Sequence, residues 1–264
     1  MTSGSQAAAA VPDTAAEQIP LVDFREICRD FGDMRAAGPI SLSVSRGEFL
    51  AIVGPSGCGK STLLNMVAGM LAPSAGEVFY NGVPVTGPNR RVGYVTQKNF
   101  LLPWRTVRKN IMLPLQFRRY DKAAARRIAD DVIRQMGLEG FEDSFPAQLS
   151  GGMAQRVAIG RTLAYSPEAY LMDEPFASLD AQLRNTMHAD LMRLWESTGA
   201  TFVFVTHDLR EAITLADRVI VMSNRPGQVK VDQPIDLPRP RDVETQTSPE
   251  FSRYFRILWS ALEA

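Results

Sequence analysis

One stretch of the chain has the residue types and the spacing of a phosphate-binding loop. It fits the pattern G-x-x-x-x-G-K-[ST] without a gap, and its members are Gly54, Pro55, Ser56, Gly57, Cys58, Gly59, Lys60, Ser61 and Thr62. Glycine lacks a Cβ, so the backbone can approach an anion closely and turn successive N–H groups toward it. Lys60 would then reach the β- and γ-phosphates of a nucleotide, and the Ser61 hydroxyl would bind Mg²⁺.

The residues on either side give this loop the context that the motif needs. The apolar run 48–53 is typical of a buried strand, and the segment 63–69 is typical of a helix. A helix that starts directly after the loop adds its unpaired N–H groups and its dipole to the attraction for phosphate. An ordinary glycine turn before a helix is the weaker alternative. We therefore expect the chain to bind a nucleoside triphosphate.

Two carboxylates, Asp173 and Glu174, close the apolar stretch 169–174. Ligands of open α/β sheets lie beyond the carboxyl ends of the strands, so both acids are expected beside the phosphates. Asp173 would hold Mg²⁺, directly or through water, and Glu174 would polarise the attacking water as a general base. Without the phosphate loop, a strand that merely ends in solvated acids would be the better interpretation.

His207 follows the strand expected at 201–206 and so falls at the same edge of the sheet. A histidine there can hydrogen-bond the γ-phosphate and the attacking water, which makes His207 a candidate catalytic residue together with Glu174 and Lys60. A satisfied surface histidine is the alternative. The chain has only two histidines, so a histidine metal site is not expected.

The run 149–156 predicts a second helix start that could bind phosphate. Ser150 is a natural N-cap, and Gly151 and Gly152 stand at the mouth of the helix that it opens. The three phosphates of one ATP already have the first loop, so the economical interpretation is that the second start serves the ATP of a neighbouring copy. A Ser-Gly-Gly cap that binds nothing is the alternative.

Apolar periodicity predicts an α/β chain with a mostly parallel sheet and crossover helices. Strands are expected at 21–29, 40–44, 76–82, 91–96, 169–173, 201–206 and 218–222, and helices at 121–136, 151–164, 181–197, 208–216 and 248–262. Residues 98–150 are expected to form a helical insert, and 1–18 a disordered tail. The formal net charge of zero gives no support to a nucleic-acid partner, and no apolar run approaches the length of a membrane span. The two cysteines, Cys28 and Cys58, are expected to be reduced.

These motifs together resemble those of the ATP-binding-cassette (ABC) ATPases, over nearly the whole chain from Leu21 onward. The resemblance implies a P-loop NTPase cassette over 19–264 with a RecA-like core, an antiparallel β subdomain and a helical subdomain. It implies ATP and Mg²⁺ as cofactors, Gln97 as the Q-loop glutamine, and Ser61, Gln97 and Asp173 as metal ligands. It also implies a signature that includes Ser150, Gly151, Gly152 and Gln155, a D-loop at 178–180 with Asp180, and His207 as the switch histidine. Phe31 would stack on adenine, or else cover the sheet edge.

Three further segments, 101–107, 222–227 and 248–251, are similar to the nitrate/taurine/aliphatic-sulfonate branch of bacterial importers. This resemblance implies a head-to-tail dimer at the cytoplasmic face of the membrane, working with transmembrane permease subunits and an extracytoplasmic substrate-binding protein. We hypothesise that Phe100, Leu101, Leu102 and Trp104 line the groove that receives a permease helix; their alternative role is the core of the insert.

Other classes of protein with a phosphate loop explain fewer of the motifs. A soluble ABC ATPase of DNA repair or translation would carry a long coiled coil or a second cassette, and a phosphate-loop kinase would have no use for the Ser-Gly-Gly start and His207. A motor subunit of an exporter, or of an importer for another small solute, stays open as the alternative.

Overall fold

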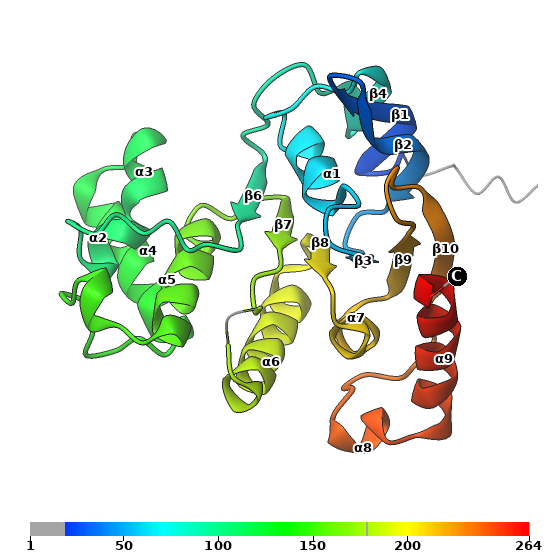
Figure 1. The fold of residues 1–264 in the computed structure, drawn as a ribbon. Coiled ribbons are helices and arrows are strands. Elements are labelled where there is room, and N and C mark those ends of the chain that lie inside the picture. Colours follow the sequence, from blue (N-terminus) through cyan, green and yellow to red (C-terminus); the bar gives the residue numbers. More distant parts are fainter. Residues whose placement is uncertain (1–18, 178, 264) are drawn as a thin grey trace, which may run out of the picture.

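The structure is a computed structural model that describes residues 19–177 and 179–263. The tail predicted for 1–18 lies outside the described residues, as does Ser178 of the predicted D-loop. The chain forms two sheets and a helical subdomain, with the helical subdomain at one side of the molecule and the C-terminal helix at the other (Figure 1).

The larger sheet has the strand order β10-β9-β3-β8-β7-β6. Five of its strands run parallel, namely β3 (Phe49–Val53), β6 (Val92–Val95), β7 (Ala169–Asp173), β8 (Thr201–Thr206) and β9 (Arg218–Met222). Strand β3 is buried at every position because both faces of this sheet are covered, which explains its continuous apolar sequence. The carboxyl ends of the parallel strands therefore meet at one edge.

The edge strand β10 (Val229–Pro234) runs antiparallel to β9 and was not predicted from the sequence. Its burial alternates residue by residue, which is the pattern of a half-exposed edge strand. The sequence Val-Lys-Val-Asp-Gln carries the same alternation, so the signal was present but short.

The smaller sheet is antiparallel with the order β2-β1-β4-β5. It consists of β1 (Val22–Phe31), β2 (Met34–Val44), β4 (Ala75–Tyr80) and β5 (Val83–Pro84). The second strand begins at Met34, six residues before the predicted start, because the small and polar residues from Arg35 to Pro39 give a weak strand signal although they pair with β1. The hairpin turn is consequently short, and Phe31 is the last residue of β1.

The two faces of the larger sheet bury separate cores. Helix α1 (Lys60–Val67) and the antiparallel sheet cover one face, where Leu50 and Ile52 point. Phe49, Ala51 and Val53 point to the opposite face, which is covered by α5 (Gly151–Leu163), α6 (Ala181–Thr198), α7 (Leu209–Leu215) and α9 (Pro249–Glu263). This alternation within β3 arises because successive side chains of a strand point to opposite faces of the sheet.

The helical subdomain contains α2 (Val107–Ile111), α3 (Leu113–Phe117), α4 (Lys122–Gln135), the 3₁₀ turn Pro146–Gln148 and the start of α5. The helix predicted at 121–136 is confirmed as α4, and Asp121 is its N-cap, accepting hydrogen bonds from Ala123 N (2.8 Å) and Ala124 N (3.2 Å). The C-terminal helix α9 is likewise confirmed and is preceded by the short helix α8 (Val243–Gln246). Within the described residues, no helix is both long enough and apolar enough to cross a membrane.

Candidate functional site

The phosphate-binding loop joins the end of β3 to the start of α1. Gly59 is the N-cap of α1 with φ +103°, a conformation that glycine adopts without the strain of a side chain. The ammonium of Lys60 is 5% exposed and donates hydrogen bonds to the carbonyls of Gly54 (2.7 Å) and Pro55 (2.9 Å). The loop thus curls around the Lys60 side chain, with Cys58 buried behind it.

A cleft of about 430 Å³ opens above this loop, within the size range of ligand sites of ~300–1,000 Å³. The residues that line it come from the β1–β2 hairpin, the phosphate loop and the edge of the larger sheet: Phe31, Met34, Ala36, Ser56, Gly57, Gly59, Lys60, Ser61, Thr62, Gln97, Glu174 and Arg225. The structure therefore brings together most of the residues predicted for nucleotide binding. Gly54, Pro55 and Cys58 lie behind the cleft wall, where the first two hold Lys60.

Three lining residues were missed by the sequence interpretation: Met34, Ala36 and Arg225. Met34 and Ala36 belong to the underestimated start of β2. Arg225 donates hydrogen bonds to the Gly57 carbonyl from Nε (3.3 Å) and Nη2 (3.1 Å), so it clamps the tip of the loop. It lies in the segment 222–227. The sequence of this segment is similar to the importer branch, but it does not indicate that the segment lies beside the phosphate loop.

Phe31 is 46% exposed at the rim of the cleft, as a base-stacking residue would be. The Arg29 guanidinium lies 4.6 Å from the centre of its ring, which is a cation–π arrangement. A planar group in the cleft could stack on Phe31 and gain a contribution of ~1–3 kcal/mol per base.

The two acids at the end of β7 have different environments. Burial raises the pKa of Asp173 and the charge of Glu174 adds to this, while a hydrogen bond from Ser61 and the charge of Lys60 lower it. Glu174 has φ +46°, which is rare for a residue with a side chain, and its N–H donates to the Val205 carbonyl at 2.9 Å. Unusual backbone geometry of this kind gathers at functional sites.

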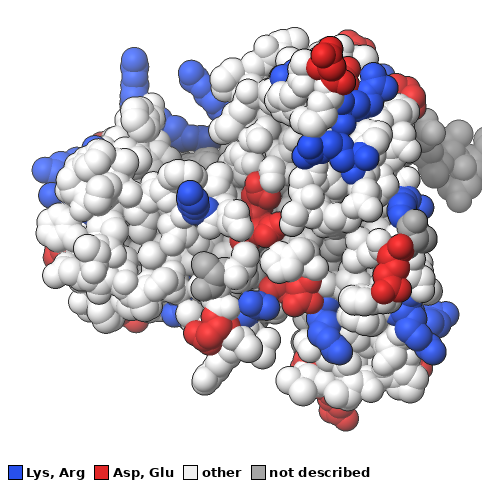
Figure 2. Space-filling model, viewed as in Figure 1, with Lys and Arg blue, Asp and Glu red and all other residues white. Residues whose placement is uncertain are grey.

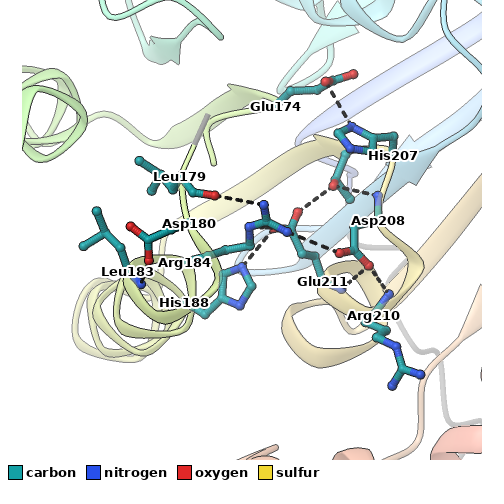
Figure 3. Close-up of polar contacts among 11 residues, drawn as sticks. Glu174, Leu179, Asp180, Leu183, Arg184, His188, His207, Asp208, Arg210 and Glu211 are labelled. Atoms are coloured by element: carbon teal, nitrogen blue, oxygen red, sulfur yellow. Dashed lines mark hydrogen bonds and ion pairs between the residues drawn. The ribbon is translucent and has the colours of Figure 1, made fainter. Parts of the chain in front are cut away.

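His207 lies directly beside Glu174. Its Nδ1 is 3.2 Å from Glu174 Oε2, and its side chain is 61% exposed (Figure 3). His207 lines a small hollow beside Glu174, which itself also lines the cleft. The expectation that the ends of β7 and β8 place the acid and the histidine together is therefore met by the geometry.

A network of buried polar side chains supports His207 from behind (Figure 3). Glu211 accepts hydrogen bonds from Thr206 Oγ1 (2.6 Å) and stands 3.2 Å from His188 Nε2. Burial alone would raise the pKa of Glu211, but the hydrogen bonds from His188 and Thr206 outweigh it and the pKa is lowered. The carboxylate is thus ionised and acts as the acceptor at the centre of the network.

Arg184 links this network to the segment of the predicted D-loop. It donates to the Leu179 carbonyl (3.0 Å) and lies 3.6 Å from both Asp208 and Glu211. Asp180 caps α6 by accepting from Leu183 N at 2.9 Å. The sequence interpretation missed Arg184, His188 and Glu211 because their shared contact arises only when α6 packs beside α7.

The predicted signature residues lie apart from the cleft. Ser150 caps α5, accepting a hydrogen bond from Met153 N at 3.3 Å, and Gly151 is open to solvent. A Cβ on Gly152 would stand 2.0 Å from Leu183 Cδ2, so the starts of α5 and α6 pack tightly. Gln155 is 1% exposed, so its amide does not share the outer surface with Ser150. In the described part of the chain, neither these residues nor Asp180 line the cleft.

Oxygen donors at the cleft suit a hard divalent cation rather than a transition metal. The Ser61 hydroxyl and the Gln97 amide line the cleft, and the Asp173 carboxylate at the end of β7 accepts a hydrogen bond from Ser61. Among residues 19–177 and 179–263, no group of three or more His, Cys, Asp or Glu side chains could hold a metal alone. This donor set fits Mg²⁺, which usually takes only one or two protein ligands and completes its shell with phosphate and water.

A parallel sheet with a phosphate loop, two acids and a histidine at its carboxyl edge defines a P-loop nucleotide hydrolase. The family profile for ABC transporters matches residues 37–177. The chain is 48% identical over 230 residues to an uncharacterized ABC transporter ATP-binding protein of Methanocaldococcus jannaschii, covering 87% of this chain and 85% of that protein. It belongs to the ABC transporter ATP-binding family, and it is an ATPase.

Two further comparisons agree with this family. The taurine import ATP-binding protein TauB of Roseobacter denitrificans is 40% identical over 238 residues, which cover 87% of this chain and 89% of TauB. A solved dimeric ATP-binding cassette with bound ADP and phosphate superposes with a TM-score of 0.74 at 32% identity, covering 82% of this chain and all of that one. The predicted fold class, an ABC cassette, is confirmed.

Proposed function

We propose that the chain hydrolyses ATP between two copies of itself and thereby drives a bacterial importer for a small anion of the nitrate, taurine or sulfonate type. The observation that carries this proposal is the separation of two phosphate-binding features. The cleft is lined by the phosphate loop and Glu174, with His207 at 3.2 Å from Glu174, whereas Ser150 and Gly151 stand outside it at a second helix start. A second copy that faces the first head to tail would bring its Ser150 over the open side of the cleft.

Each residue of the cleft then has a defined task. The N–H groups of the loop and the Lys60 ammonium bind the β- and γ-phosphates, and Phe31 stacks on adenine. Ser61, Gln97 and Asp173 would hold Mg²⁺, which supplies charge neutralisation at the transferred phosphoryl group when bound. Glu174 turns from His207 to the attacking water and accepts a proton from it, and His207 is then free to hydrogen-bond the γ-phosphate and the water.

The helical subdomain offers the surface for a permease. Phe100 and Trp104 are 66% and 71% exposed, while Leu101 packs against the core. The backbone beneath them is held firmly, since Asn110 is fully buried and bonds Leu102 N (2.8 Å) and Leu102 O (3.2 Å). The face of this subdomain seen in Figure 2 carries few charged side chains, with Lys and Arg around its edges and a further basic group within it. A preformed apolar surface of this kind suits an apolar helix of a partner.

The location and the further partners follow from the same proposal. A permease in the membrane would hold this chain at the cytoplasmic face, and an extracytoplasmic substrate-binding protein would deliver the cargo. TauB, whose name states taurine import, supports the importer assignment over an exporter. Cargo contacts would belong to the other subunits, so the anion class rests on this relative and on the resemblance of 101–107 and 222–227.

A mixing experiment tests the composite site directly. Lys60→Ala removes the phosphate contact in one copy, and Ser150→Phe blocks the second helix start in the other. Each variant alone should lose ATPase activity, but a mixed dimer holds one intact site, made from the loop of the Ser150→Phe copy and the Ser150 of the Lys60→Ala copy. We expect mixing to restore a substantial part of the activity, with Lys60→Ala/Ser150→Phe chains as the control that cannot complement. An absence of rescue in a mixture that forms dimers would refute the head-to-tail site.

A further inference from the structure

A second cavity, of about 350 Å³, lies between α6, the end of α7 and the segment 239–246. Figure 1 shows α6, α7 and α8 at the end of the molecule opposite the antiparallel sheet. The volume falls within the range of small-molecule sites. Apolar groups of Ala189, Met192, Leu215, Pro240 and Val243 form much of the wall. ATP binding, the second helix start and the permease surface make no use of this cavity.

Two hydrogen-bond donors in the wall are available to a ligand. Thr214 is 8% exposed, and within residues 19–177 and 179–263 its hydroxyl has no hydrogen-bond partner. Arg239 uses Nη2 on the Leu215 carbonyl (2.7 Å) and on Asp217 (2.8 Å), whereas Nη1 contacts only the thioether of Met192 at 3.4 Å. An acceptor in the cavity could take a hydrogen bond from each of these two groups.

The wall also carries a buried positive charge. Arg241 is 8% exposed and donates to main-chain carbonyls, including Ile213 (2.6 Å) and Ala216 (2.6 Å). No carboxylate in the described part of the chain forms a salt bridge with it. Burial lowers the pKa of Arg241 to about 10, and the charge of Arg239 contributes to this. The charges of Asp217 and Asp236 balance Arg241 in part. The charged side chains of the cavity wall as a whole are the cations Arg193, Arg239 and Arg241 and the acids Glu196 and Asp242. An anion in the cavity would therefore meet a net positive wall.

One side chain connects the cavity to the hydrolytic site. His188 is 9% exposed, lines the cavity, and has Nε2 on Glu211 at 3.2 Å. Glu211 in turn accepts a hydrogen bond from Thr206 Oγ1 at 2.6 Å, and Thr206 immediately precedes His207 in the sequence. The path from the cavity wall to Glu174 therefore consists of the contacts His188–Glu211, Glu211–Thr206 and His207–Glu174.

We propose that this cavity binds a small organic anion with an apolar body, a carboxylate or a sulfonate, and that its occupation lowers kcat for ATP hydrolysis. The anionic head accepts hydrogen bonds from Thr214 and Arg239, and the body packs on Ala189 and Met192. A ligand that contacts His188 stabilises the contact between its ring and Glu211. The contact of Glu211 with Thr206 then keeps the next residue, His207, in contact with Glu174. Because Glu174 has to turn to the attacking water, hydrolysis slows. This coupling rests on the proposed roles of Glu174 and His207.

Benzenesulfonate and methyl phenyl sulfone form a matched pair of probes, alike in size and different in charge. Calorimetric titration is performed on the full chain with saturating ADP, so that a sulfonate cannot occupy the phosphate loop. We expect benzenesulfonate to bind with a Kd on the order of 1 mM, from its few atoms, and the neutral sulfone about tenfold more weakly. Saturating benzenesulfonate should lower kcat about fivefold and leave the KM for ATP unchanged.

Two variants locate the probe. Ala189→Trp fills the cavity and should abolish binding; Ala123→Trp, an exposed helix alanine of α4, is the matched control. Thr214→Val keeps the shape of the wall, removes the hydroxyl and should weaken binding about tenfold.

Three results would overturn the site: no saturable binding up to about 10 mM, equal binding of the sulfone, or undiminished binding in both cavity variants. An unchanged kcat in saturated protein would overturn the coupling. The rate of ATP hydrolysis without benzenesulfonate tests the proposed function independently of the cavity.

Discussion

Replacing Glu211 by glutamine tests whether one buried carboxylate stabilises the contacts between α6, α7 and the residue before His207. The wild-type carboxylate is 6% exposed and accepts from Thr206 at 2.6 Å and from His188 at 3.2 Å, with Arg184 at 3.6 Å. Glutamine has nearly the same shape but keeps only one acceptor oxygen, so it can serve one of the two donors and opposes the other with an NH₂ group.

The expected loss follows from these contacts. A hydrogen bond to a charged group contributes ~1.5–3 kcal/mol and a neutral one ~0.5–1.5 kcal/mol. Glu211→Gln weakens one bond to the neutral value and loses the other, while the smaller desolvation of an amide offsets part of the loss. We expect the free energy of unfolding to fall by about 2 kcal/mol at neutral pH, measured by urea titration.

The stability difference between wild type and Glu211→Gln should also depend on pH, in a direction that follows from the pKa of Glu211. The pKa of Glu211 is lowered in the folded protein from the ordinary value of 4.5, so the unfolded chain binds the proton more tightly. The stabilisation is therefore complete above that ordinary value and is lost as the pH falls through the lower folded value. The stability difference between wild type and Glu211→Gln should accordingly be constant from pH 8 to about 5 and shrink at lower pH. A difference below ~0.5 kcal/mol at pH 7, or one that grows on acidification, would refute the reasoning.

Three other substitutions test the cleft and the surfaces around it. Glu174→Gln should retain ATP binding but lower kcat by ~10²–10⁴-fold, the usual contribution of a general base; turnover near the wild-type rate would show that Glu174 is not the base. Trp104→Ala should leave the ATPase activity of the isolated chain intact and weaken its co-purification with permease subunits, whereas unaltered transport would count against the docking surface. Gly152→Ala should destabilise the protein by no more than ~1 kcal/mol, because its Cβ would stand 2.0 Å from Leu183 Cδ2, the end of a half-buried side chain that can turn away; Leu183→Ala in the same chain should remove this cost, and no recovery would mean that the strain lies elsewhere.

The sequence was sufficient to predict the parts of the site that follow from local patterns. The phosphate loop is a contiguous motif, and the apolar strands β3, β7 and β8 end where their polar residues begin. Since parallel strands share one carboxyl edge, the approach of Glu174 to His207 could be expected from strand order alone. The alternation of strands and helices predicted the α/β class, the resemblance of the motifs to ABC ATPases predicted the cassette, and the fold class is confirmed.

The residues that escaped prediction depend on packing between distant segments. Arg225 is far from the loop in sequence, and it reaches Gly57 only because the segment after β9 lies against the phosphate loop, where a Cβ on Gly227 would stand 1.8 Å from the Cys58 carbonyl. Met34 and Ala36 escaped because small and polar residues hid the start of β2. Glu211 and His188 stand on different helices, and no spacing within either helix indicates that they meet.

Helix α6 joins the two halves of the proposed composite site within one chain. Its first turn packs against the signature helix, since Gly152 leaves no room between the backbone of α5 and Leu183. The next residue, Arg184, contacts Leu179, Asp208 and Glu211, and Nε of this guanidinium is buried with its nearest acceptor among the described residues at 3.6 Å. Because 3.6 Å is longer than a hydrogen bond, a small movement of Arg184 toward Glu211 would form one.

In the proposed dimer, a nucleotide that displaced the start of α5 would act on the Leu183 side chain, which contacts Gly152. A movement of Leu183 would also move the next residue, Arg184, relative to Glu211. It would thereby change the contacts of Glu211 with Thr206, the residue before His207. Under the proposed head-to-tail arrangement, this packing would couple the helix start that faces the partner's ATP to His207 beside the chain's own ATP.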